Sequence, residues 1–395
     1  MKKVVLAFSG GLDTSYCAMH LSKDLNYQVH AITVNTGGFS QEEAEALKTK
    51  AYNLGVKDYK FDDQTQNFYE KGIKYLLFGN VLKNNSYPLS VSAERVFQAV
   101  ATANYANEIG ADAIAHGSTG AGNDQIRFDL IFQTICPGKE IITPIRDQSL
   151  TREEEIEFLS KNGVKSNWEK AKYSINQGLW GASIGGKETL TSHEYLPEEA
   201  FLHHCEKEDP QLIEIGFEKG EPVSLNGEKT DPVTVIKSLN ELANQYAIGR
   251  DIHVGDTILG IKGRVGFEAA APLILIKAHH QLEKHVSSKH QLFIKDQLSS
   301  WYGNLMHEGQ YLDPAMRDIE AFLDSSQNRV SGTVKVRLYP YNFLIEGISS
   351  PFDLMQSKVA QYGETNDAWT GEDARGFAKI FSTQTKIIKS LDHEN

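Results

Sequence analysis

A glycine turn near the N-terminus constrains the fold more than any other feature of the chain. The segment Ala7–Ser15 reads Ala-Phe-Ser-Gly-Gly-Leu-Asp-Thr-Ser and directly follows the apolar run Val4–Leu6. The apolar run predicts a buried strand, and a helix is expected over about Thr14–Leu25. Glycines in such a turn let the backbone approach a ligand, and the following helix presents free N–H groups at its start. Together with the hydroxyls of the segment, this pattern predicts an anion site sized for phosphate.

The turn lacks the Gly-Lys-Ser/Thr ending of a Walker A loop. Its pattern, Ser-Gly-Gly-x-Asp-Thr-Ser, resembles the pyrophosphate loop of the N-type ATP pyrophosphatases. That resemblance implies a loop that holds the β- and γ-phosphates of ATP and leaves the α-phosphate open to attack. The alternative is a strand-to-helix turn that carries glycines by coincidence. The strand before the turn, the helix after it and the hydroxyls within it favour the nucleotide site.

Length, composition, net charge and cysteine number indicate which kind of protein this chain forms. At 395 residues, 40% of them hydrophobic and 23% charged, the chain is expected to form a globular protein of two or three domains. A net charge of −12 argues against a nucleic-acid partner. Cys17, Cys136 and Cys205 are widely spaced, so they predict neither a zinc ribbon nor a redox pair, and their odd number fits a reducing compartment. The first apolar run is too short for a signal peptide or a membrane span, and we expect a cytoplasmic protein with no membrane partner.

Strand and helix patterns alternate over the first 150 residues, which favours a parallel, doubly wound sheet with ligands at the carboxyl ends of its strands. The expected strands are Val4–Phe8, Val29–Val34, Tyr59–Phe61, Ala113–His116 and Ile141–Ile145, and the expected helices are Ser40–Leu54, Phe68–Leu82 and Ala93–Ile109. Thr151 and Glu154 form a capping-box pattern that predicts a helix over Arg152–Lys161.

The pattern changes to α+β from about Lys170 to Ala360. Strands are expected at Ala271–Ala278 and Gly332–Tyr339, and helices at Val233–Ala247, Asp296–His307 and Pro314–Ser326. The segment Tyr173–Leu190 is rich in glycine and serine, which is typical of a loop that faces a ligand. The segment Gly371–Leu391 predicts an amphipathic helix whose apolar stripe a neighbouring subunit or the same chain must cover.

A second glycine loop lies at Ala115–Phe128, after another predicted strand, and carries three glycines in six residues. It also holds Asn123, Asp124 and Arg127. Such a loop can recognise a polar zwitterion through its backbone and side chains together, because Arg127 can bind a carboxylate through two parallel hydrogen bonds. The alternative is a solvated surface loop, which three glycines and an arginine flanked by Ile and Phe disfavour.

The two loops together are similar to those of the argininosuccinate synthases. The stretches Tyr173–Ile175, Gly220–Gly227 and Gly376-Phe377 extend this resemblance through nearly the whole chain, in order. It implies an ATP-dependent ligase that joins citrulline to aspartate in arginine biosynthesis, with Mg²⁺ on the ATP phosphates and no metal held by the protein alone. It also implies an α/β fold: a doubly wound nucleotide-binding domain at residues 1–168, an α+β synthetase domain at 169–365, and a C-terminal oligomerisation helix at 366–395 that clasps other subunits of a homotetramer.

The resemblance also implies three binding sites and a catalytic set. ATP would be bound by Ala7, Phe8, Ser9, Gly10, Gly11, Leu12, Asp13, Thr14, Ser15, Val34 and Gly117. Aspartate would be bound by Thr119, Asn123 and Asp124, and citrulline by Tyr87, Ser92, Asn123, Arg127, Ser174 and Ser183. Ser9, Asp13, Thr14, Asp124 and Arg127 would carry the catalysis by positioning and charge stabilisation, without a covalent nucleophile.

Four positions depart from the family pattern. Ala121 replaces a lysine of the second loop, and Asn35 replaces an acidic residue after the second strand. Gly255 stands where the family has an acidic residue that binds citrulline, and Phe267 stands where it has a tyrosine. Because of these departures, a catalytically inactive scaffold is one alternative to the enzyme. A tRNA-thiolating enzyme with the same pyrophosphate loop is a further alternative, although such enzymes typically need a basic surface or paired cysteines.

The loss of the acid at Gly255 raises a question about the substrate. The α-ammonium of free citrulline needs a carboxylate partner, because a buried unpaired charge costs several kcal/mol. One interpretation is that a carboxylate from elsewhere, such as Asp256 or Glu268, takes over. Asp256 is expected on the opposite face of its strand unless a bulge intervenes. The other interpretation is a citrulline whose α-amine is acylated and therefore uncharged, with Gly255 providing room and Phe267 an apolar wall.

Overall fold

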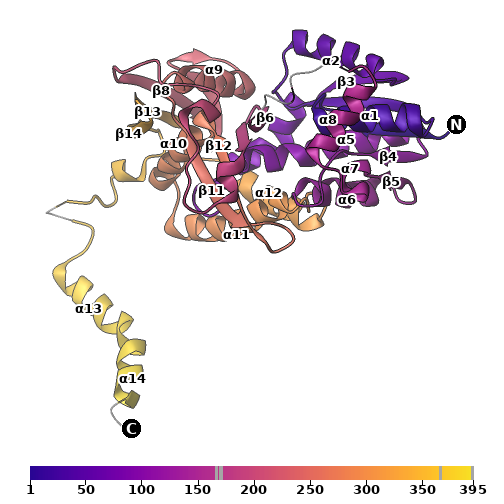
Figure 1. Cartoon of the computed structure of the whole chain (residues 1–395). Helices are drawn as coiled ribbons and strands as arrows, with labels where there is room; N and C mark the ends of the chain where they lie inside the picture. The colour runs from indigo at the N-terminus through magenta and orange to yellow at the C-terminus, as the bar shows by residue number, and fades with distance from the viewer. Residues whose placement is uncertain (165–167, 169–171, 364–366, 393–395) are drawn as a thin grey trace.

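The computed structural model describes residues 1–164, 168, 172–363 and 367–392. Two bodies lie side by side, and a C-terminal arm projects away from them (Figure 1). The first body is built on a five-stranded parallel sheet with the strand order β3-β2-β1-β4-β5. Its strands are β1 (Lys3–Ala7), β2 (Gln28–Asn35), β3 (Asp58–Asp63), β4 (Ala113–Ala115) and β5 (Glu140–Ile142). This sheet confirms the doubly wound α/β prediction.

Helices cover both faces of this sheet, and β1 therefore buries alternate residues in two different cores. Val5 packs in the core that contains α5, whereas Val4 and Leu6 pack in the core that contains α1 and α8. The helices of this body are α1 (Leu12–Met19), α2 (Gln41–Asn53), α3 (Thr65–Phe68), α4 (Lys74–Phe78), α5 (Ser90–Glu108), α6 (Asp124–Ile135), α7 (Pro144–Gln148) and α8 (Arg152–Lys161). The capping box of Thr151 and Glu154 is present at the start of α8, as predicted. One π-helical turn (His20–Asp24) extends α1 almost to the predicted end.

The second body contains two antiparallel sheets. One has the order β10-β9-β8-β13-β14 and the other the order β11-β12-β7-β6. Their strands are β6 (Ser174–Gly178), β7 (Gly181–Gly185), β8 (Gln211–Glu218), β9 (Glu221–Leu225), β10 (Glu228–Lys229), β11 (Arg250–Asp256), β12 (Lys262–Glu268), β13 (Gly332–Tyr339) and β14 (Asn342–Ser349). The main helices are α9 (Pro232–Asn244), α10 (Ala270–Val286), α11 (Lys289–His307) and α12 (Pro314–Ser326).

Three local predictions are wrong. Ala271–Ala278 forms part of helix α10 rather than a strand. The first half of this helix is buried on most of its sides, so Ala271–Ala278 is apolar except for Lys277 and mimics a buried strand. Tyr173–Leu190 contains the hairpin of β6 and β7 instead of a loop, and the strand predicted at Ile141–Ile145 ends at Ile142 because Pro144 begins helix α7.

The β6–β7 hairpin ties the two bodies together. The backbone N–H of Leu179 donates to the carbonyl of Thr36 at 2.9 Å, just after β2. The buried indole of Trp180 donates to the carbonyl of Pro88 at 3.0 Å, just before α5. These two bonds fix the hairpin against the carboxyl ends of the parallel strands, where ligands bind in open α/β sheets.

The predicted C-terminal helix is two helices, α13 (Gly371–Phe381) and α14 (Thr383–Asp392), with Ser382 between them. Their apolar side chains face solvent, with Phe377 67% and Ile380 76% exposed. In Figure 1 this arm, drawn in yellow, lies away from both bodies. Among the described residues, no helix has the length and hydropathy needed to cross a bilayer.

Candidate active site

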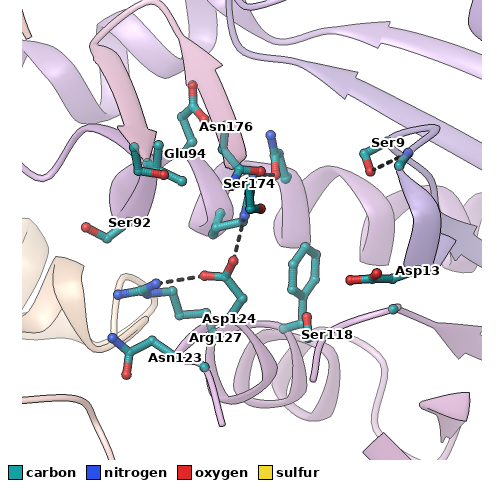
Figure 2. A pocket seen from close by; sticks show the side chains of 18 of the residues that line it. Ser9, Asp13, Ser92, Glu94, Ser118, Asn123, Asp124, Arg127, Ser174 and Asn176 are labelled. Atoms are coloured by element: carbon teal, nitrogen blue, oxygen red, sulfur yellow. Dashed lines mark hydrogen bonds and ion pairs between the residues drawn. The ribbon is translucent and has the colours of Figure 1, made fainter. Parts of the chain in front are cut away.

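A cavity of about 920 Å³ lies where the two bodies meet. Its floor is the carboxyl end of the parallel sheet, and its walls are α5, the second glycine loop, the β6–β7 hairpin and strands β11 and β12. Figure 2 shows Ser9 and Asp13 on one side of this space and Ser92, Asn123 and Arg127 on the other. Most of the residues named for the three binding sites line it: Ala7, Phe8, Ser9, Gly11, Leu12, Asp13, Thr14, Val34, Tyr87, Ser92, Gly117, Thr119, Asn123, Asp124, Arg127, Ser174 and Ser183.

The first glycine loop turns sharply into α1, which begins at Leu12 with Gly11 as its N-cap. The hydroxyls of Ser9 and Thr14 lie 3.2 Å apart, and the Ser9 hydroxyl also accepts a hydrogen bond from the N–H of Gly11 at 3.4 Å. The two hydroxyls and the free N–H groups at the helix start therefore converge on one point of the cavity. This is the arrangement that an anion such as pyrophosphate requires.

Two residues predicted to bind ATP do not line the cavity. Ser15 is fully buried, and its hydroxyl donates to the carbonyl of Gly11 at 2.6 Å, so it stabilises the turn instead of facing a ligand. Gly10 has a φ of +72°, and a Cβ there would lie 2.3 Å from Cδ2 of Leu47, on helix α2. Gly10 is therefore needed for the backbone turn and for packing against α2. A side chain at this position would not block the path of the phosphates.

The second glycine loop contacts the first through Gly117. A Cβ at Gly117 would lie 3.2 Å from the carbonyl carbon of Asp13 and 3.3 Å from the backbone nitrogen of Thr14. The loop is anchored by His116, whose Nε2 lies 2.9 Å from Asp129, while its Nδ1 accepts from the N–H of Ser118. A side chain at position 117 would therefore require these two backbone segments to move apart by a few tenths of an ångström.

Asp124 lies between two guanidinium groups (Figure 2). Its Oδ2 accepts from Nε of Arg95 at 3.0 Å, and its Oδ1 accepts from Nη1 of Arg127 at 2.8 Å. Burial alone would raise the pKa of Asp124, but the two guanidiniums outweigh it and lower that pKa. Arg127 is itself buried and donates to the carbonyl of His307 at 2.8 Å. The pair is therefore a fixed ionic unit and supplies directed N–H groups to the cavity.

The three serines predicted for citrulline come from α5 and from the β6–β7 hairpin, which are distant in the sequence. Ser92 lies on α5, Ser174 on β6 and Ser183 on β7, and Ser183 is paired with Asn176 in the hairpin. The Ser92 hydroxyl is buried and has no hydrogen-bond partner within the protein. Asn123 accepts from the backbone N–H of Ile258 at 2.8 Å through its side-chain oxygen, which orients its amide group.

Sequence reasoning missed several residues of the cavity, chiefly Glu94, Arg95, Asn176, His253 and His307. Arg95 follows Ser92 by three residues on α5, so a helical projection would have placed the two on one face. His253 precedes Gly255 by two residues on β11, so both share a face of that strand. No comparable local signal points to His307, which reaches the cavity from the end of α11.

Beneath the pyrophosphate loop, two carboxyls lie close together. Glu155 on α8 is buried beside Asp13, and burial together with that neighbouring carboxyl raises the pKa of Glu155 to about 8. Burial also raises the pKa of Asp13. The folded protein therefore holds Glu155 in its neutral form at neutral pH.

In the Glu155→Gln variant, the melting temperature is expected to fall less between pH 5 and pH 9 than in the wild type. Because folding raises the Glu155 pKa, its contribution to stability is complete below the unfolded value and is lost as the pH rises through about 8. The wild type should therefore lose melting temperature relative to the variant between pH 5 and 9. Glu153→Gln, on the exposed face of the same helix, is the matched control. Parallel profiles for wild type and Glu155→Gln would contradict the assignment.

Comparison with known proteins agrees with this geometry. The model of the argininosuccinate synthase N-terminal HUP domain matches residues 3–165, and that of the argininosuccinate synthase C-terminal domain matches residues 173–388. The chain is 38% identical over 363 residues to an argininosuccinate synthase of Methanocaldococcus jannaschii, covering 91% of each protein. It is 39% identical over 389 residues to that of Dictyoglomus turgidum, covering 98% of this chain and 97% of the relative. A third, from Pyrococcus furiosus, is 35% identical and covers 99% of this chain and 95% of the relative.

Both family models together span nearly the whole chain, and the matched relatives are covered almost end to end. The cavity lies between the two matched regions and takes residues from both. The chain therefore belongs to the argininosuccinate synthase family.

Proposed function

We propose that the chain catalyses the reaction of its family, the ATP-dependent joining of a citrulline to aspartate, with release of AMP and pyrophosphate. One observation carries the proposal. A single cavity contains the pyrophosphate loop, the Asp124–Arg127 ionic unit and the serines of the β6–β7 hairpin, although these segments are far apart in the sequence. A site for one ligand would not need all three.

In the first step, the β- and γ-phosphates lie on the loop of Ser9 and Thr14, and the α-phosphate faces the middle of the cavity. The ureido oxygen of citrulline attacks the α-phosphorus, and the bond to the bridging oxygen of pyrophosphate breaks. The N–H groups at the start of α1 stabilise the negative charge that develops on the leaving pyrophosphate.

In the second step, the amine of aspartate attacks the activated ureido carbon, and AMP leaves with the electron pair of the C–O bond. The amine must lose a proton to become a nucleophile. No side chain forms a covalent intermediate, so the contribution of the protein is to align three substrates and to stabilise charge.

The proposed binding roles follow from the side chains on each wall. Thr119, Asn123 and Asp124 would bind aspartate, with the carboxylate of Asp124 taking the ammonium. Arg127 would bind an α-carboxylate, because its guanidinium keeps N–H groups beyond those used by His307 and Asp124. Tyr87, Ser92, Ser174 and Ser183 would orient the polar ends of citrulline.

Mg²⁺ fits this site as a companion of the ATP phosphates. Within the described residues, no group of three or more His, Cys, Asp or Glu side chains could hold a metal on its own. Asp13 lies at the pyrophosphate loop and is the carboxylate placed to share a phosphate-bound ion. When bound, Mg²⁺ would neutralise charge on the phosphates during attack and departure.

Release of pyrophosphate tests the proposal. The protein is expected to release pyrophosphate from ATP only when both a citrulline and aspartate are present at steady state. Release that required tRNA and a sulfur donor would favour the thiolating alternative. A protein that binds ATP but releases no pyrophosphate with any citrulline would support the inactive scaffold. The family's substrates also favour a cytoplasmic location, which we propose on that ground.

We further propose that α13 and α14 hold a homotetramer together. Their exposed stripe includes Phe377, Ile380 and Phe381, an apolar surface that a soluble monomer would not leave in water. Deleting the residues after Thr370 is expected to lower the mass measured by light scattering. The full-length chain with Glu372→Gln, a change on the polar side of α13, should keep the mass of the wild type. A full-length monomer would overturn the proposal.

A further inference from the structure

The end of the cavity assigned to citrulline has a wall without carboxylates. Strands β11 and β12 pair in an unbroken antiparallel register, which places His253 opposite Val265 and Gly255 opposite Gly263. All four residues line the cavity. On this face of the two strands the wall presents an imidazole, an isopropyl group and two facing glycines, and none of these can neutralise an ammonium group.

The two carboxylates expected to compensate for Gly255 do not reach this wall. Asp256 follows on the other face of β11, because the register contains no bulge. Its side chain is 61% exposed and pairs with Lys262 at 2.6 Å. Asp256 is among the residues that line the cavity, but its carboxylate is neutralised by Lys262 in an exposed ion pair.

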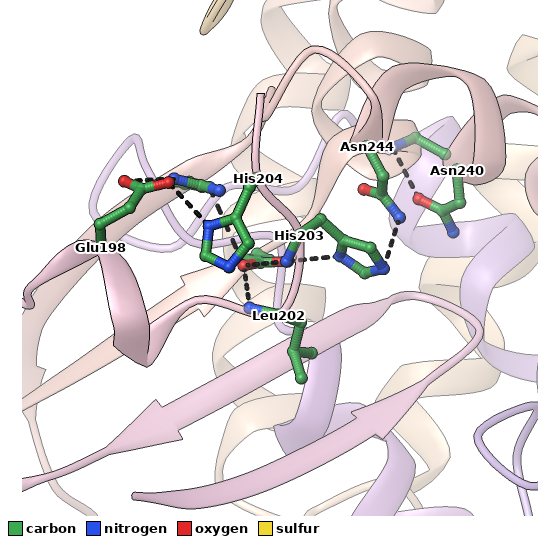
Figure 3. Close-up of polar contacts among 9 residues, drawn as sticks. Glu198, Leu202, His203, His204, Asn240 and Asn244 are labelled. Atoms are coloured by element: carbon green, nitrogen blue, oxygen red, sulfur yellow. Dashed lines mark hydrogen bonds and ion pairs between the residues drawn. The ribbon is translucent and has the colours of Figure 1, made fainter. Parts of the chain in front are cut away.

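Glu268 is turned away from the cavity as well. Its Oε1 accepts from the backbone N–H of Leu202, and its Oε2 lies 2.7 Å from Nδ1 of His203. Figure 3 shows Leu202 and His203 in this cluster, together with Asn244, which lies against the other ring nitrogen of His203. The carboxylate of Glu268 is thus fully used on the outer side of the sheet.

The remaining acidic residues that line the cavity come from other elements than β11 and β12. Asp124 is held by two arginines and is the carboxylate proposed to take the ammonium of aspartate, and Asp13 lies at the pyrophosphate loop. Glu94, on α5, is 1% exposed and packs against the hairpin, where a Cβ at Gly178 would lie 1.2 Å from its Oε1, and this oxygen has no hydrogen-bond partner within the protein. Burial raises the pKa of Glu94 to about 7. Among the described residues that line the cavity, no further carboxylate is present.

Hydrogen-bonding groups without partners are present at the same wall. His253 is 5% exposed and stacks on Tyr87 with ring centroids 5.1 Å apart, and its Nδ1 has no hydrogen-bond partner in the protein. Its Nε2 lies 2.6 Å from the position that a Cβ of Gly255 would take. A side chain at position 255 would thus displace this imidazole. An unpartnered polar atom that is buried at a cavity wall calls for a ligand atom to bond it.

We propose that the citrulline substrate of this chain carries an acyl group on its α-amine. This inference rests on the proposed function and concerns the same site. Acylation converts the ammonium into a neutral amide, which needs no carboxylate partner, and it brings a carbonyl oxygen and an N–H that His253 can bond. Val265, which lines the cavity, gives the acyl group an apolar surface, and Gly255 leaves the place of a side chain to the imidazole of His253. The amide takes no part in either chemical step and passes unchanged into the product.

The substrate preference is measured as kcat/KM for pyrophosphate release with saturating ATP and aspartate. Citrulline, N-acetylcitrulline and N-succinylcitrulline serve as the three probes. For at least one acylated probe, kcat/KM is expected to be tenfold or more above the value for free citrulline. The acetyl and succinyl arms distinguish a neutral acyl group from one that ends in a carboxylate. A preference for free citrulline would overturn the inference while leaving the proposed function intact. Release with none of the three would instead overturn the proposed function.

A pair of variants at Val265 tests the cause. Val265→Glu places a carboxylate on the wall, whereas Val265→Gln is of equal size without the charge. The glutamate variant is expected to shift the ratio of acylated to free citrulline by at least tenfold toward free citrulline, and the glutamine variant should shift it far less. Equal shifts in both variants would show that the missing charge does not set the preference. Melting temperatures of the two proteins confirm that both are folded.

Discussion

The Asp124→Asn variant is expected to lose about a hundredfold or more in kcat/KM for pyrophosphate release, the scale seen when one preorganised charge is removed from an active site. Asp124 bridges Arg95 and Arg127, so its removal leaves two guanidiniums facing each other without a counter-ion. Arg127, at 4% exposure, cannot compensate by turning to water. Its N–H groups would move from the positions proposed to hold a substrate carboxylate.

The same variant is expected to be less stable, because it leaves the buried guanidinium of Arg127 without its half-buried counter-ion. Asp324→Asn is the matched control, since Asp324 pairs with Lys74 at 3.4 Å on the surface of the molecule. The control should keep both activity and melting temperature. Activity of Asp124→Asn within a few-fold of the wild type would show that the ionic unit only stabilises the fold.

The parallel sheet was predictable from the sequence because its signals are local. Each strand is a short apolar run, and each is followed by a turn or a capped helix, as at Ser40 and Thr151. The second body was harder to predict. The first half of helix α10 is buried by neighbours that come from distant segments, and the polar face of the helix begins only at Lys277, so Ala271–Ala278 gives no helical signal. The boundaries set at residues 168 and 365 stay predictions.

The candidate site could be predicted where a motif fixes the backbone and not where packing decides the direction of a side chain. The pattern of the first loop correctly indicated Ser9 and Thr14 as cavity residues, but it gave no sign that Ser15 points inward. The relation between Asp124 and Arg95 joins two helices, so no spacing in the sequence reveals it. The same holds for Glu268, whose partners lie some 65 residues away.

The Gly117→Val variant is expected to abolish measurable ATP binding. The two glycine loops approach so closely at Gly117 that a Cβ would lie 3.2 Å from the backbone of Asp13. A backbone atom cannot rotate away as the end of a side chain can, so the first loop must shift. The Cβ alone requires a shift of a few tenths of an ångström, the two further methyl groups of valine add to it, and the hydrogen bonds from the N–H groups of α1 to the phosphates lengthen.

Calorimetric titration with ATP and Mg²⁺ measures this effect directly, and the melting temperature reports separately on the fold. Gly347→Val is the matched control, because a Cβ at Gly347 meets no atom within 4 Å and valine suits a strand. The control should bind ATP as the wild type does. Unchanged ATP affinity in a folded Gly117→Val protein would mean that the second loop does not support the first. The Ser9 loop would then hold ATP without support from the second loop. The contact at Gly117 would then not link the ATP site to the site of the amino-acid substrates.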